Sequence, residues 1–146
     1  ATSTMGGDHT FGNALPGRGG IDTHSTEKQA GFVRNLQAHS AYMMDSTGFC
    51  LFVGPSFTKL GPTAELLNAK YGTNFTEEQI YNAGIEVIKQ EIRFNRAAGV
   101  PDIDIPEFER IEPLPPFNTV FDVPMEDIKR VHDFDYEFPA EKKTNW

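Results

Sequence analysis

The residue types best suited to chemistry meet in residues 45–50, which read Asp-Ser-Thr-Gly-Phe-Cys and contain the only cysteine of the chain. A thiolate can bind a metal, but free cysteine is also among the most buried residue types in proteins. Asp45 can accept hydrogen bonds from an amine, and Gly48 can adopt a positive φ or let a ligand approach the backbone. Two interpretations therefore stay open: a buried structural cysteine, or a metal or redox site.

A second stretch whose side chains could take part in catalysis is residues 6–10, which read Gly-Gly-Asp-His-Thr. An imidazole such as that of His9 exchanges protons near neutral pH, and a neighbouring carboxylate such as Asp8 can orient it. The alternative is a solvated loop histidine. Residues 1–20 are rich in glycine, lack an initiator methionine and show neither helical nor strand periodicity. We therefore expect a glycine-rich loop in an excerpt of a longer protein.

Residues 45–50 resemble the Asp-x-x-Gly-Leu-Cys motif of the tungsten-containing aldehyde ferredoxin oxidoreductases, with Phe49 in place of leucine. The resemblance implies that Asp45, with Gly48 and Phe49, binds the pterin of a tungsten bis-pterin cofactor. It implies that Cys50 is the fourth ligand of a [4Fe-4S] cluster beside that pterin. Such a cluster needs four thiolates, so the other three would come from the amino-terminal domains of the family, which this chain lacks.

Residues 1–10 resemble a second family motif, Ala-Thr-Ser followed by Gly-x-Asp-His-Thr, which precedes the cysteine motif by some forty to fifty residues. The resemblance implies that His9 lies next to the tungsten as a catalytic proton carrier and that Asp8 contacts the cofactor. Met5 stands where the commoner version of the motif has arginine. The likeness continues through Arg-Phe-Asn-Arg at residues 93–96 and a proline-bracketed segment at residues 105–116.

The elements that must position these motifs are helices. Apolar residues at 3.6-residue spacing and three capping signals predict helices over residues 26–44, 63–71, 76–98 and 125–134. Residues 101–124 alternate prolines and acids and are expected to be an extended connection. We therefore predict an all-α, multihelical C-terminal domain that spans residues 1–146 as one unit.

Two of these helices carry specific expectations. Ser25 or Thr26 should cap the first helix, whose core-facing stripe is expected at Phe32, Leu36, Ser40 and Met43, with Val33 beside it. The third helix should begin with a capping box, because Thr76 and Gln79 lie three residues apart. Gly84 inside that helix costs about 1 kcal/mol relative to alanine, so we expect another helix to approach closely there.

Composition limits the partners and the compartment. The chain has 146 residues, 38% hydrophobic and 23% charged, which is typical of one globular domain. A net charge of −8 argues against nucleic acid and against an anionic membrane surface. No apolar run approaches the ~20 residues of a membrane helix. A single cysteine excludes an internal disulfide, which is typical of the cytoplasm.

Three functions are compatible with these observations. The resemblance implies part of an enzyme that oxidises aldehydes to carboxylic acids and passes electrons to ferredoxin, inactive without its remaining domains. A non-enzymatic helical interaction module is the second, and a related tungsten-pterin reductase with another substrate is the third. His132-Asp133 is an acid–histidine pair, but no nucleophile or ligand spacing supports a site there.

Overall fold

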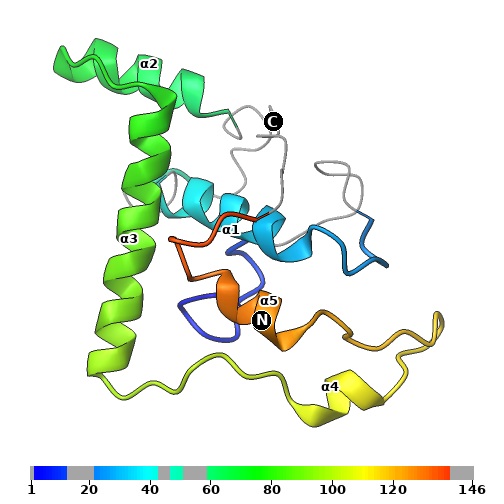
Figure 1. The fold of residues 1–146 in the computed structure, drawn as a ribbon. Coiled ribbons are helices and arrows are strands. Elements are labelled where there is room, and N and C mark those ends of the chain that lie inside the picture. Colours follow the sequence, from blue (N-terminus) through cyan, green and yellow to red (C-terminus); the bar gives the residue numbers. More distant parts are fainter. Residues whose placement is uncertain (1, 13–21, 43–46, 51–58, 139–146) are drawn as a thin grey trace.

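The computed structural model describes residues 2–12, 22–42, 47–50 and 59–138 (Figure 1). The described part of the chain is helical and contains no sheet, which confirms the predicted all-α class. Its helices are α1 (Gln29–Ser40), α2 (Leu60–Tyr71), α3 (Glu77–Ala97), α4 (Glu107–Ile111) and α5 (Met125–Arg130).

The long helix α3 is the support for the other elements. Helix α1 crosses its middle, α2 packs near its start, and α5 lies against α1 (Figure 1). The amino-terminal segment, blue in Figure 1, runs between α1 and α5. It is tied to α3 at Thr4, whose hydroxyl donates to Glu91 Oε2 at 2.7 Å and whose carbonyl accepts from Asn95 Nδ2 at 2.6 Å.

The capping box predicted for the start of α3 is confirmed. The Thr76 hydroxyl accepts a hydrogen bond from the Gln79 backbone N–H at 3.2 Å, and the Thr76 N–H donates to Gln79 Oε1 at 2.9 Å. These two bonds satisfy amide groups that have no partner within the helix. The helix ends at Ala97, and Gly99 follows with a φ of 75°, a conformation that favours glycine.

The close approach predicted at Gly84 is also confirmed, and its partner is α1. Gly84 is buried, and a Cβ atom at this position would overlap the carbonyl of Ala38. A side chain here would therefore force the two helices apart. The core beside this crossing is small and apolar, and its fully buried members are Phe11, Ala38, Ala41 and Ile88.

The start and the buried face predicted for α1 are wrong. The helix begins at Gln29, because the Ser25 hydroxyl accepts from the Glu27 N–H at 3.1 Å and thus closes a turn before the helix instead of capping it. Of the expected stripe, Phe32 is buried, whereas Leu36 and Ser40 are half-buried. Met43 lies outside the described residues. The buried residues are Ala30, Gly31, Phe32, Arg34, Gln37, Ala38 and Ala41.

Two helix boundaries differ from the prediction. Helix α2 starts at Leu60, three residues before the predicted start, since Pro62 fits the first turn of a helix. Helix α5 ends at Arg130 rather than at residue 134, and Ile128 and Val131 are buried. Beyond Arg130, the Arg34 guanidinium binds backbone carbonyls that would otherwise accept helical hydrogen bonds.

Helix α4 corrects the prediction of a wholly extended connection over residues 101–124. Pro106 precedes the helix, and Glu107 and Glu109 lie in its first turn, where negative charge is favourable. The helix buries no residue, and its five residues are too few to establish a period of 3.6. None of the helices in the described ranges has the length and apolarity required to cross a membrane.

Candidate functional site

The loop that carries His9 is shaped by the side chain of Asp8. Asp8 Oδ1 accepts hydrogen bonds from the Thr10 N–H at 3.0 Å and the Thr10 hydroxyl at 2.8 Å. Asp8 Oδ2 accepts from the Phe11 N–H at 2.9 Å. These hydrogen bonds, with a smaller contribution from the charge of His9, hold the pKa of the Asp8 carboxyl below its usual value. Asp8 therefore folds the loop, and its oxygens are directed to Thr10 and Phe11 rather than to the imidazole.

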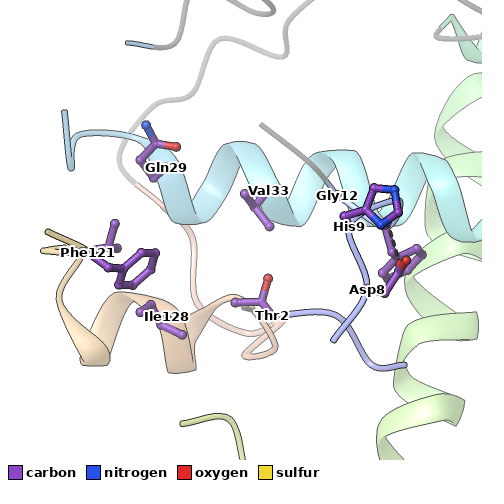
Figure 2. A pocket seen from close by; sticks show the side chains of 10 residues that line it. Thr2, Asp8, His9, Gly12, Gln29, Val33, Phe121 and Ile128 are labelled. Carbon is purple, nitrogen blue, oxygen red and sulfur yellow. Dashed lines mark hydrogen bonds between the residues drawn. The ribbon is translucent and has the colours of Figure 1, made fainter. Parts of the chain in front are cut away.

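His9 itself is exposed and lies at one end of a groove beneath α1 (Figure 2). The groove has a volume of about 380 Å³. Gln29 and Phe121 mark its other end, and Thr2 and Val33 lie between the two ends (Figure 2). The described lining residues are Thr2, Asp8, His9, Phe11, Gly12, Gln29, Val33, Phe121, Val123 and Ile128.

Four separate segments build this groove, and only its His9 end was predicted from the sequence. Val33 comes from α1 and Ile128 from α5. Phe121 belongs to the connection before α5, where no periodicity marks a buried face. The alternation of Phe121 and Val123 is too short to indicate a binding surface by itself.

The predicted cysteine site is described in part. Asp45 lies outside the described residues. Gly48 has a φ of 72°, which favours glycine, and the Phe49 N–H donates to Thr47 Oγ1 at 3.4 Å. Phe49 is half-buried and Cys50 is exposed, so the interpretation of Cys50 as a buried structural residue is wrong.

Cys50 does not share a metal site with other residues that the structure describes. Within the described ranges no group of three or more His, Cys, Asp or Glu side chains is placed to hold a metal ion. Gly48, Phe49 and Cys50 are also absent from the described lining of the groove that carries His9. The structure therefore brings Asp8 and His9 together with the groove, but not with the cysteine motif.

His132 occupies a second polar environment, beside Thr2 of the amino-terminal motif. Burial lowers the pKa of its imidazole to about 4, and the nearby charges of Arg34 and Arg96 lower it further, against a hydrogen bond with the Thr2 backbone. Its Nε2 atom is buried and has no partner among the described residues. Nothing in this arrangement pairs His132 with Asp133 as an acid–base couple.

The neutral imidazole of His132 predicts a pH-dependent stability. The unfolded state has the ordinary pKa of 6.5 and binds more protons than the folded state, so this contribution is complete above pH 6.5 and is lost as the pH falls towards 4. Between pH 7 and pH 4 we expect wild type to lose about 3 kcal/mol relative to His132→Phe. Urea unfolding of wild type and His132→Phe at several pH values measures the difference.

Comparison with known proteins gives one match. The family model described as aldehyde ferredoxin oxidoreductase, domains 2 & 3, matches residues 1–126 of the 146. That range contains the His9 loop, the groove residues up to Val123 and the cysteine motif. No curated protein and no solved structure matches the chain.

Proposed function

The chain belongs to the aldehyde ferredoxin oxidoreductase family, and from this membership we propose that it is the carboxyl-terminal part of a tungsten-pterin, iron–sulfur enzyme. The proposed enzyme oxidises aldehydes to carboxylic acids and passes the electrons to ferredoxin. The observation that carries the proposal is the family match over residues 1–126, which includes both motifs in their expected order. We place the enzyme in the cytoplasm because the chain has one cysteine and no internal disulfide.

The residues present fit one part of the cofactor site. Cys50 offers an exposed thiol that a cluster held by other domains could reach, and the turn at Gly48 carries no side chain that would block a neighbouring group. A [4Fe-4S] cluster needs four thiolates in its usual form, and this chain has one. The proposal therefore includes partner domains of the same polypeptide that supply three cysteines, and it makes the chain inactive without them.

His9 is the proposed catalytic residue of this chain. Oxidation of an aldehyde with water gives a carboxylic acid, two protons and two electrons. The tungsten-pterin, when bound, supplies the two-electron redox chemistry. The exposed imidazole of His9 can take one proton at a ring nitrogen, and Asp8 positions His9 by fixing the backbone that follows it.

Direct tests distinguish the proposed enzyme from a helical interaction module and from a related enzyme with another substrate. Tungsten and iron analysis of the complete protein separates the enzyme from a helical interaction module, because a module would contain neither metal. A panel of aldehydes and other reducible substrates separates the proposed aldehyde oxidation from another reaction on the same cofactor. Neither test depends on the isolated chain being active.

Replacing Cys50 with serine in the complete protein should remove or destabilise the iron–sulfur cluster and leave the fold intact. A serine oxygen is a poorer ligand for iron than a thiolate, and an exposed position tolerates the change structurally. Iron content and the visible absorbance of the cluster measure the effect. Phe49→Leu, which restores the leucine of the family motif, is the control and should keep its iron. Wild-type iron in the serine variant would refute the ligand role.

A further inference from the structure

The groove beneath α1 is mainly apolar where it runs away from His9. Phe11, Val33, Phe121, Val123 and Ile128 contribute carbon surface to it. Its volume of about 380 Å³ lies at the small end of ligand sites in proteins. A ligand of a few carbon atoms or one aromatic ring fits this size better than a nucleotide does.

Away from the His9 end, the polar lining residues Thr2 and Gln29 already make hydrogen bonds within the protein. Thr2 uses its carbonyl and its hydroxyl to accept hydrogen bonds from Gln37 Nε2, at 3.0 and 2.9 Å. Gln29 Nε2 donates to the carbonyls of Asp22 and Ser25, at 2.8 and 2.9 Å. A hydroxylated ligand would lose hydrogen bonds to water and find these groups occupied, which costs free energy.

The charge of the groove is unfavourable for anionic ligands. Its described lining includes the Asp8 carboxylate and contains neither lysine nor arginine. The hydrogen bonds from Thr10 and Phe11 favour the ionised form of Asp8. A phosphorylated or carboxylated substrate would meet this negative charge, and no lysine or arginine of the described lining would balance it.

We propose that the groove binds the apolar carbon skeleton of the substrate, an unsubstituted alkyl chain or an aryl ring, with the reacting carbonyl at the His9 end. Because His9 lies at one end of the groove, Val33 in its middle and Phe121 at its other end (Figure 2), a single ligand can contact all three. This inference rests on the proposed function for its reacting group. The selectivity for an apolar skeleton follows from the lining.

The test uses primary amides, which mimic the carbonyl group but do not react, and the complete protein. Ligand-observed NMR measures the affinities of butanamide, pentanamide and hexanamide, of benzamide, and of 2,3-dihydroxypropanamide. We expect about fourfold tighter binding for each added methylene and no detectable binding of the dihydroxy compound. Equal affinities along the alkyl series, or tight binding of the dihydroxy amide, would overturn the proposal.

A matched pair of variants assigns the binding to this groove. Val33→Phe fills it, and Val100→Phe makes the same change at an exposed position outside it. We expect hexanamide to bind about tenfold more weakly to the first variant and normally to the second. If Val33→Phe does not fold, Val123→Phe tests the same space from the loop before α5. Unchanged binding to the folded groove variant would contradict the proposal.

Metal analysis of the same preparations separates this inference from the proposed function. Full iron and tungsten content with no preference for apolar amides would reject the inference and leave the oxidoreductase proposal standing. Preference for apolar amides that Val33→Phe abolishes, in a protein without metal, would support the groove and reject the oxidoreductase proposal.

Discussion

Replacing Arg34 with alanine should lower the free energy of unfolding by about 3 kcal/mol or more. Arg34 is 8% exposed, and its guanidinium donates to four backbone carbonyls, one at the last residue of α5 and three in the segment after it. The distances are 2.9 Å to Val131, 2.6 Å to Tyr136 and 2.7 Å to Asp133, and Arg130 is the fourth acceptor. The alanine variant would leave the Val131 and Tyr136 carbonyls without this donor, whereas those of Arg130 and Asp133 keep a backbone N–H donor. It would also remove the packing of the guanidinium on an aromatic ring.

That ring belongs to Phe138, whose centroid lies 4.3 Å from Arg34 Cζ. Arg34→Lys should recover less than half of the lost stability, because a single ammonium cannot reproduce the planar fork of donors. Denaturant unfolding followed by circular dichroism measures both variants. Arg93→Ala, at an exposed arginine of α3, is the control and should change stability by no more than about 0.5 kcal/mol. If Arg34→Ala also lost no more than about 0.5 kcal/mol, the contacts of Arg34 would contribute no net stability.

Arg34 also explains where sequence reasoning about the fold failed. The stripe predicted for α1 was chosen by hydrophobicity, which places arginine and glutamine on the solvent side of a helix. In the structure, Arg34 and Gln37 are buried because backbone groups of distant segments accept their hydrogen bonds. Those acceptors lie 35 to 102 residues away along the chain, so no local pattern reveals them.

Where a structural feature depends on local interactions, the sequence predicted it well. The capping box at Thr76 involves residues three apart, and α2 ends at Gly72, which has the αL conformation that favours glycine. Gly84 is an instructive case, because an unfavourable residue inside a strong helix indicated a close contact without identifying its partner. Helix α4 was missed because it is only five residues long and buries none of them, so the sequence shows no sustained helical period there.

In the candidate site, too, the features that depend on neighbouring residues were predicted and those that depend on distant residues were not. Short motifs located His9 and Asp8, because the chemistry of each motif resides in neighbouring residues. The groove depends on residues from the amino-terminal loop, α1, the connection before α5 and α5 itself. Their proximity follows from the packing of α5 and the amino-terminal segment on α1, which the sequence does not specify locally. The role of Asp8 also required the structure, because its oxygens bind the loop backbone rather than the imidazole.

In the complete, metal-loaded protein, His9→Asn should reduce turnover by about 100-fold, within the range of roughly 10²–10⁴ for general acid–base help. His9 is exposed at the end of the groove, so the substitution leaves no buried cavity and should not disturb folding. Asparagine retains a polar side chain that can donate hydrogen bonds but cannot accept a proton near neutral pH. The change therefore removes proton transfer with little loss of binding.

Tungsten and iron are measured first, because a variant that lost its metals would lose activity for another reason. His24→Asn, the same substitution at an exposed histidine outside the groove, is the control and should turn over at the wild-type rate. Because His9 is proposed to act on a proton rather than on binding, kcat should fall while KM for the aldehyde stays nearly unchanged. Wild-type turnover of His9→Asn at full metal content would make His9 a loop residue without a catalytic role. A raised KM at unchanged kcat would assign it to substrate binding instead.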